Sequence, residues 1–284
     1  MQEILNIFEE TVLDTIKLLP FLFITYLIME YIENKTSDKV KETIKKSGKF
    51  GPLLGAIVGI FPQCGFSVSS TNLYSARVIT LGTLIAVYLT TSDEMLPILL
   101  TESVSLTTIL LILGIKLVIG IIAGFLIDVI YRIINKNNNE EQKIDELCKH
   151  EHCHCEDGIF ISAVKHTLNI MIFIFIITFI INCIITAIGE ETIAHVISKN
   201  IILGPIIAGL IGLIPNCASS VILTELFIEN IIAMPVLISG VCVNAGVGLL
   251  VLFKTNKNIK ENFKIVGLLY AIGVISGIIL ELIM

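Results

Sequence analysis

The sequence predicts an all-α polytopic membrane protein built from two inverted repeats. Each repeat is expected to hold three spanning helices and one re-entrant broken-helix hairpin, which gives ten membrane segments in all. Three observations lead to this prediction. The chain is strongly apolar, a repeat of 153 residues relates its halves, and its basic residues gather on one side of the expected topology.

The apolar character is continuous rather than scattered. Hydrophobic residues make up 55% of the 284 residues, charged residues only 15%, and the mean hydropathy is +0.90. Unbroken runs such as ILLILGIKLVIGIIAGFLIDVI (109–130) match the roughly 20 apolar residues that a membrane-spanning helix needs. The first residues, MQEILNIFEE, lack the basic start of a secretory signal peptide, so we expect no cleaved leader.

An internal repeat organises the chain. GIFPQCGFSVSSTNLY (59–74) aligns with GLIPNCASSVILTELF (212–227), which places Pro62 on Pro215 and Cys64 on Cys217. Self-similarity at a fixed offset indicates tandem duplication. We therefore divide the chain into a first transmembrane repeat (1–134), a Cys/His-rich linker (135–157) and a second transmembrane repeat (158–284).

Each half contains the same elements in the same order. These are a full span (12–33; 160–188), a Gly-Pro segment (51–75; 204–228), an interrupted span (78–101; 231–252) and a closing span (103–131; 264–284). Each arm of a Gly-Pro segment has about 11 residues and covers about 16 Å, half of the hydrocarbon layer. Such a segment is either one kinked span or a hairpin whose tip reaches the membrane midplane.

The basic residues decide between the two readings. With hairpins, sixteen Lys and Arg residues face one side, Lys17 and Lys199 face the other, and Lys116 lies inside a span. Kinked spans would place the basic residues of 132–149 outside, against the positive-inside rule. We therefore expect hairpins in the plasma membrane, with the linker cytoplasmic and both termini outside.

The hairpin tips are the first candidate site. Proline removes a donor and disfavours helix before it, so nearby carbonyls lose their partners, which is costly in lipid unless they line a cavity. Serines after each break can cap the next helix. The tips would present Gln63, Cys64, Ser67, Thr71 and Asn72, and Asn216, Cys217, Ser220, Thr224 and Glu225. The alternative is a proline kink with small residues for tight helix packing.

The interrupted spans are the second candidate site. LTTSDEMLP (89–97) places Thr91, Ser92, Asp93 and Glu94 in an apolar run, and VCVNAGVGLL (241–250) supplies Asn244. Acids at membrane depth are functional candidates because an unpaired charge is costly there. The alternative is that Asp93 and Glu94 cap a helix at the outer interface. Glu30 and Lys116 are candidates for ion coupling, although Lys116 would serve equally in a structural salt bridge.

The linker carries a third cluster. CKHEHCHCED (148–157) brings six imidazoles and thiols into eight residues, enough for a tetrahedral Zn²⁺-like site. These residues are Cys148, His150, His152, Cys153, His154 and Cys155. We interpret the cluster as a flexible chelating tract that delivers or senses metal, against chance enrichment of a polar loop. No cofactor is otherwise required, and the cysteine pattern does not indicate disulfides.

The residues of the two membrane sites favour a metal ion. Carboxylate, amide, hydroxyl and free carbonyl oxygens suit ions such as Mn²⁺, whereas thiols favour Zn²⁺, Cu⁺ or trivalent arsenic. Only two arginines occur in the chain, so a polyanionic substrate is poorly supported, and we expect no nucleic-acid partner.

Several motifs resemble those of one family. FPQCGF, IPNCASS, LTTSDEMLPIL, HCHCEDGIF and GVGLLVLFKTN together resemble the ten-transmembrane heavy-metal exporter family, over nearly the whole chain. This family is related by name to the arsenical permeases, and members are also described as manganese transporters or arsenic efflux proteins. The resemblance implies export of a metal or metalloid, and six spans plus four hairpin arms give its ten segments.

We therefore expect a secondary transporter, not an enzyme, that exports a divalent Mn-like ion by alternating access. A coupling proton or sodium ion, the lipid bilayer and a second copy of the chain are its expected partners. The first alternative is arsenite or an organoarsenical, with Cys64 and Cys217 as ligands. A distant alternative is an intramembrane lipid-pyrophosphate phosphatase, which would need arginines around a phosphate pocket.

Overall fold

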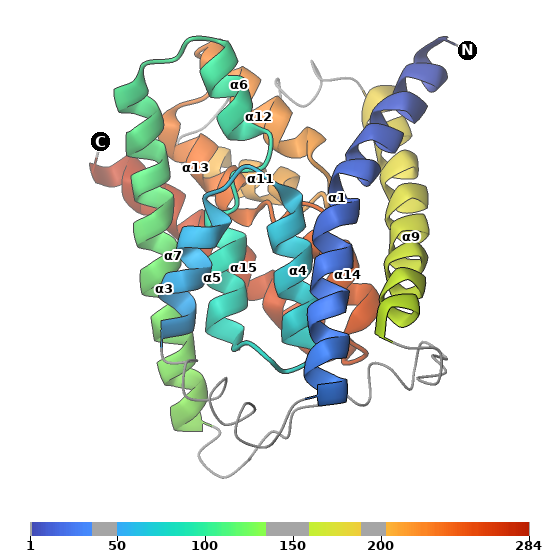
Figure 1. Cartoon of the computed structure of the whole chain (residues 1–284). Helices are drawn as coiled ribbons and strands as arrows, with labels where there is room; N and C mark the ends of the chain where they lie inside the picture. The colour runs from blue at the N-terminus through green and yellow to red at the C-terminus, as the bar shows by residue number, and fades with distance from the viewer. Residues whose placement is uncertain (1, 36–49, 135–158, 189–202, 284) are drawn as a thin grey trace.

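The computed structural model describes residues 2–35, 50–134, 159–188 and 203–283, and every regular element in these ranges is a helix (Figure 1). The first half contains α1 (Gln2–Lys35), α3 (Gly51–Gly59), α4 (Cys64–Ser75), α5 (Leu81–Thr90), α6 (Met95–Thr101) and α7 (Leu106–Ile134). The second half contains α9 (Ile159–Ile188), α11 (Leu203–Gly212), α12 (Ala218–Ile228), α13 (Met234–Val243), α14 (Gly248–Thr255) and α15 (Ile259–Ile283).

Length and composition identify membrane spans among these helices. Within the described residues, five segments are long and apolar enough to cross a bilayer: Leu81–Thr101, Leu106–Ile134, Ala163–Cys183, Met234–Thr255 and Ile259–Ile283. Large apolar side chains of α7, among them Leu110, Val118, Ile122 and Leu126, point outward and are exposed. Continuous exposed apolar surface of this kind suits a lipid environment. The chain is therefore a multi-pass membrane protein.

The expected interruptions are confirmed at matching positions in both halves. α3 ends at Gly59 and α4 begins at Cys64, so Pro62 lies in the gap; α11 ends at Gly212, before Pro215. The spans 78–101 and 231–252 are likewise split, into α5 and α6 and into α13 and α14. Backbone conformation repeats as well, because Arg77 and Asn230, 153 positions apart, have φ of 59° and 60°.

One expectation about the breaks is wrong. The helices that follow them have no side-chain cap: α4 starts after Gln63 and α12 after Cys217, and neither residue makes a capping hydrogen bond. The serine hydroxyls instead donate to carbonyl oxygens, Ser67 to Cys64 and Ser220 to Cys217, each at 2.8 Å. These serine side chains therefore bond to carbonyl oxygens at the start of each new helix rather than to its free amides.

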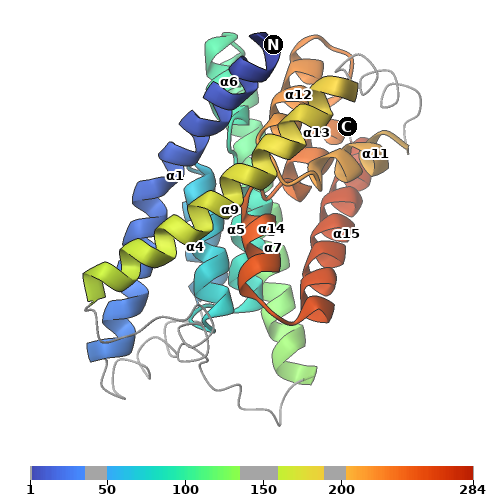
Figure 2. The ribbon, with the colours of Figure 1, turned by 90° about the vertical axis from the view of Figure 1, so that its right-hand side faces the viewer.

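The broken helices occupy opposite ends of the molecule. In Figure 1, α3, α4 and α5 lie in the lower part, whereas α11, α12 and α13 lie in the upper part. The continuation of each interrupted span lies at the other end, α6 at the top and α14 at the bottom, as Figure 2 also shows after a quarter turn. The four gaps between the paired helices therefore come to the middle of the molecule.

Helix contacts follow the same scheme in both halves. α5 packs on α3 and α7 in the first half, and α13 packs on α11 and α15 in the second. Each half also contacts the other in the same way. α4 of the first half packs on α14 of the second, and α12 of the second half packs on α6 of the first. The remaining long helices, α1 and α9, pack along one another. Each hairpin is thus held by an element of the other half.

Glycines allow the closest approach in this packing. A Cβ atom at Gly124 would lie 2.7 Å from the carbonyl oxygen of Gly82 and 2.8 Å from Cβ of Pro52. The same atom at Gly114, on the same helix α7, would meet nothing within 4 Å. Small residues at helix contacts are the usual means of tight packing in membranes.

This contrast gives a stability prediction. We expect Gly124→Ala to lower the free energy of unfolding by about 1–3 kcal/mol, because the added methyl group overpacks the contact of α7 with α3 and α5. Gly114→Ala should be neutral or stabilising by up to about 1 kcal/mol, since alanine favours helix. Thermal unfolding of the two variants in detergent measures the difference. Equal midpoints would show that this contact is loose.

Candidate ion site

The two hairpin tips meet through their cysteines. Cys64 is the first residue of α4, Cys217 immediately precedes α12, and their sulfur atoms lie 3.1 Å apart. Both are free thiols; Cys64 is buried and Cys217 is half-buried. The two copies of the repeated Pro-x-Cys motif therefore contribute to one site rather than to two.

A carboxylate joins the two thiols. Asp93 lies in the gap between α5 and α6, and its φ of 28° is unusual for a residue other than glycine. It is only 4% exposed, and neither carboxylate oxygen has a hydrogen bond of ordinary geometry among the described residues, although the Cys64 thiol and the Lys116 ammonium lie near enough to act on it. A carboxylate oxygen and the two sulfur atoms all lie within 4.8 Å of one another. An unpaired buried acid of this kind is costly unless it binds something.

Gly246 makes room for this acid, and sequence reasoning missed its role. Gly246 is the repeat counterpart of Asp93, and it also has a positive φ, of 54°. A Cβ atom there would lie 2.6 Å from Oδ2 of Asp93 and 3.5 Å from Sγ of Cys64. One half therefore supplies the acid and the other supplies the space for it. The repeat offset of 153, which aligns Asp93 with Gly246, was the sequence signal that could have revealed this pairing.

A cavity of about 60 Å³ opens beside the two cysteines, which line it, whereas Asp93 does not. Five residues predicted from the sequence lie in its wall: Gln63, Cys64, Glu94, Asn216 and Cys217. Residues of α1 and α9 complete it, among them Asp14, Lys17 and Thr178, which sequence reasoning did not single out. Asp14 pairs with Lys17 at 3.0 Å, and their charges offset one another. The acids that remain near the cavity are Glu94 and Asp93, and their negative charge attracts cations.

The two amide residues anchor the tips. Gln63 Nε2 donates to the carbonyl oxygen of Lys17 at 3.2 Å, which ties the first tip to α1. Asn216 donates to Asn182 of α9, whose own amide donates to Thr11 of α1 at 3.2 Å. Both amides therefore position the cysteines through contacts with α1 and α9.

The expected hydroxyl ligands are occupied within their helices. Thr71 and Thr224 donate to the carbonyl oxygens of Ser67 and Ser220, at 2.7 and 2.6 Å. Thr91 donates to Val87 at 2.7 Å and Ser92 to Thr90 at 3.2 Å. None of these side chains lines the cavity beside the thiols. The structure does not bring them into the site.

Other predicted residues lie elsewhere. Asn72 is buried two turns along α4, where its Oδ1 accepts a hydrogen bond from Tyr26 at 3.4 Å. Asn244 ends α13 and accepts from the amide of Gly246 at 2.7 Å, and Glu225 is exposed on α12. The side chain of Glu30 and the linker residues Cys148, His150, His152, Cys153, His154 and Cys155 lie outside the described residues.

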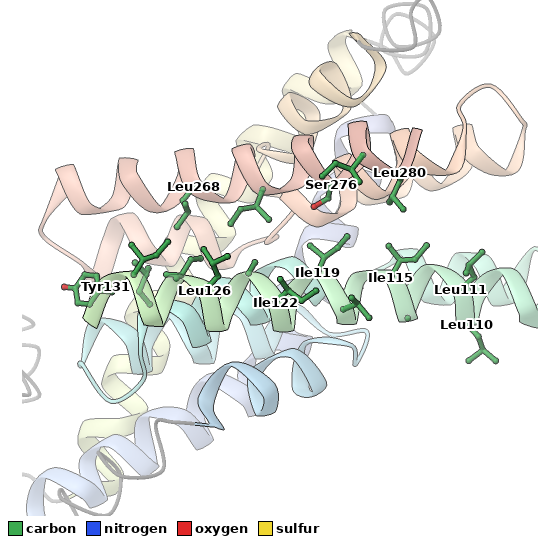
Figure 3. Close-up of a pocket in the computed structure, with 18 of the residues that line it drawn as sticks. Leu110, Leu111, Ile115, Ile119, Ile122, Leu126, Tyr131, Leu268, Ser276 and Leu280 are labelled. Atoms are coloured by element: carbon green, nitrogen blue, oxygen red, sulfur yellow. The ribbon is translucent and has the colours of Figure 1, made fainter. Parts of the chain in front are cut away.

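A large apolar groove is not part of this site. A groove of about 920 Å³ runs between α7 and α15, and Figure 3 shows side chains from both helices along it. Apart from Ser276 and the hydroxyl of Tyr131, its lining is leucine, isoleucine, valine, alanine and glycine. It offers no metal ligand, and both of its walls are membrane spans, so it faces lipid.

The three ligand atoms suit a soft metal ion. Zn²⁺ takes thiolate at about 2.3 Å and carboxylate at about 2.0–2.2 Å, so neighbouring ligand atoms around one ion stand about 3.5 Å apart. Separations of 3.1 Å between the sulfurs and at most 4.8 Å across the set need only a small adjustment. Three protein ligands also leave a coordination position open, as an ion that must leave again requires.

Broken helices that meet inside a bilayer around polar groups are the feature by which secondary transporters are recognised. Comparison with protein-family models matched residues 4–174, more than half of the chain, to the family described as "Putative, 10TM heavy-metal exporter". The chain belongs to this family, as its motifs predicted. Neither the curated proteins nor the solved structures gave a match.

Proposed function

We propose that the protein is a secondary transporter that exports a thiophilic divalent metal cation, with Cys64, Cys217 and Asp93 as its ligands. One observation carries the proposal. Two thiols and an unpaired buried carboxylate, contributed by both halves of the chain, converge within 4.8 Å beside a cavity. Membership of a heavy-metal exporter family supports the direction and the general class of substrate.

The donor set favours Zn²⁺-like ions over Mn²⁺. Mn²⁺ prefers oxygen ligands, but the hydroxyls of Thr71, Thr91 and Thr224 do not line the cavity beside the thiols. The three groups that converge are two sulfur atoms and one carboxylate, a mixture that Zn²⁺ and Cd²⁺ accept well. Our proposal therefore moves from Mn²⁺ to a softer cation.

Arsenite is the second candidate, because trivalent arsenic binds paired thiols and the Cys64 and Cys217 sulfurs are in contact. The carboxylate argues for a cation instead. The buried Asp93 carboxylate has no hydrogen bond of ordinary geometry among the described residues, and arsenite is a neutral molecule near pH 7 that cannot compensate its charge.

We also propose that the halves are inverted repeats with re-entrant hairpins and that they work by alternating access. Opposite placement of the two hairpins, matching interruptions and exchanged contacts between halves support this reading. The distribution of basic residues favours a cytoplasmic linker and outside termini in the plasma membrane. The linker Cys/His cluster would then meet metal in the cytosol and deliver or sense it.

A transporter also explains the two arginines better than a phosphatase does. Arg77 pairs with Glu261, at 2.7 Å, between the end of α4 and the start of α15. Arg132 lies in the last turn of α7. Neither arginine lines the cavity beside the cysteines, so no phosphate pocket forms there.

A substrate panel in proteoliposomes tests the proposal. Purified protein should transport Zn²⁺ and Cd²⁺ at least about tenfold faster than Mn²⁺ at equal concentration, which corresponds to about 1.4 kcal/mol in favour of sulfur-containing ligands. Each ion is measured with and without a pH gradient, next to protein-free liposomes. Transport of Mn²⁺ alone, or of arsenite alone, would contradict the proposed substrate, and transport of no metal would contradict the proposed class.

A further inference from the structure

Lys116 lies at the crossing of the two interrupted spans. It belongs to α7, is 0% exposed, and its Nζ donates to the carbonyl oxygens of Thr91 at 2.5 Å and Val241 at 3.0 Å. Thr91 terminates α5, and Val241 lies in the last turn of α13. The ammonium group therefore bridges the C-terminal ends of two half-helices from different halves of the chain.

Its charge is matched by these helix ends rather than by a salt bridge. Lys116 does not belong to the ion pairs of Lys17 with Asp14 or of Arg77 with Glu261, and the Asp93 carboxylate acts on it through Coulombic attraction without forming such a pair. The C-terminal end of a helix carries about half a negative charge, so two ends together offset about one positive charge. One ammonium group thus satisfies both ends and their free carbonyls.

In secondary transporters, the C-terminal ends of half-helices and the unwound carbonyls beside them are where a coupling sodium ion is coordinated. We propose that Lys116 is a built-in cation that takes the place of a coupling sodium ion in this transporter. The inference rests on the proposed transport function and deepens it: the transport cycle does not use Na⁺. Lys116 acts by positioning the gaps that carry Asp93 and Gly246, two and five residues after its partners Thr91 and Val241.

The alternative that Lys116 is an ordinary structural cation makes a different prediction. If the role of Lys116 is only structural, any variant that keeps the fold should transport metal, and Na⁺ should not change its transport rate. A substitute-ion role predicts that removal of the ammonium opens a position that a small cation can fill. Serine at position 116 leaves such a space with a hydroxyl oxygen, whereas methionine fills it with apolar atoms.

Cd²⁺ uptake into proteoliposomes in NaCl or choline chloride distinguishes the two. The wild-type protein should transport Cd²⁺ at the same rate in NaCl as in choline chloride. The rate of Lys116→Arg should likewise not depend on the salt. Lys116→Ser should be nearly inactive in choline and recover by at least about tenfold in Na⁺, because the ion replaces the lost charge. Lys116→Met should be inactive in both. Na⁺-dependent transport by the wild type, an Na⁺-independent active K116S, or an active K116M would each overturn the inference.

Thermal unfolding in detergent separates this inference from the transport proposal. Na⁺ should raise the unfolding midpoint of K116S but not of the wild type, whether or not any metal is transported. If the wild type moves no Cd²⁺ while this sodium effect is present, the proposed substrate fails and the role of Lys116 stands. If Na⁺ leaves the midpoint of K116S unchanged, or K116S cannot be purified folded in NaCl, the inference about Lys116 fails.

Discussion

Replacing Cys64 with serine is expected to reduce Cd²⁺ transport by at least about 100-fold. Loss of residues that merely support a metal ligand already costs about 10–100-fold in affinity, so loss of the ligand itself should cost more. Serine keeps the size of the side chain but supplies a neutral hydroxyl that soft metals bind poorly. Cys217→Ser should behave in the same way, because the two sulfurs lie 3.1 Å apart and serve one ion.

The double variant should be hardly worse than either single variant, since residues that act as one unit are not additive. Cys183→Ser is the matched control: Cys183 is also a free, half-buried cysteine in a membrane helix, α9, but it does not line the cavity. Uptake of ¹⁰⁹Cd²⁺ at a fixed amount of reconstituted protein gives the rates. A double variant that transports within about twofold of the C183S control would exclude the thiols as ligands.

The breaks in the helices could be predicted from sequence because their cause is local. Pro62 and Pro215 remove a donor and disfavour helix just before them, although Pro20 inside the continuous helix α1 shows that proline alone does not always break a helix. The repeat doubled this signal, which separated a designed interruption from an incidental kink. Even so, the detail of the break was not predictable: Ser67 and Ser220 satisfy carbonyls instead of capping the new helix.

Which polar residues face the site depends on long-range geometry that the sequence does not display. Asp93 and Glu94 are adjacent and looked equivalent, but a single left-handed backbone position turns Asp93 inward to the thiols. Thr71 and Asn72 looked like ligands because they lie beside the motif, yet helix geometry places Asn72 about 12 Å beyond Cys64.

The asymmetry between the halves carries the most information about the site. The repeat aligns Asp93 with Gly246, and the structure brings the two together, with a Cβ at Gly246 only 2.6 Å from the carboxylate. Two acids at these positions would repel each other, and two glycines would leave no charge. The two copies of the repeat therefore differ at this pair of positions. One copy supplies the Asp93 carboxylate, and the other supplies Gly246, which leaves the space that the carboxylate occupies.

Asp93→Asn is expected to separate transport from stability. The amide has nearly the shape of the carboxylate, so the fold should persist, but the variant loses the one carboxylate among the three ligands that converge. We expect Cd²⁺ transport to fall by at least about 100-fold. At the same time the unfolding midpoint should rise by about 2–4 °C, because an unpaired buried charge is removed.

Asp128→Asn provides the matched control with the opposite sign. Asp128 is also a buried acid on a membrane helix, but both of its oxygens are bonded, to Thr80 at 2.7 Å and to the amide of Gly82 at 2.8 Å. Its carboxylate caps the start of α5, so its loss should lower the midpoint by about 2–4 °C. Metal binding should be unaffected, because Asp128 is not one of the three groups that converge at the proposed site.

Metal-dependent thermal shifts complete the comparison. At a Cd²⁺ concentration about 100 times the dissociation constant, binding stabilises the folded state by about 2.7 kcal/mol, so the midpoint of the wild type and of D128N should rise on addition of Cd²⁺. D93N should start higher and show no rise. If D93N binds Cd²⁺ as the wild type does, or if it is destabilised as D128N is, then the carboxylate is held by interactions other than a metal ion and the site must lie elsewhere.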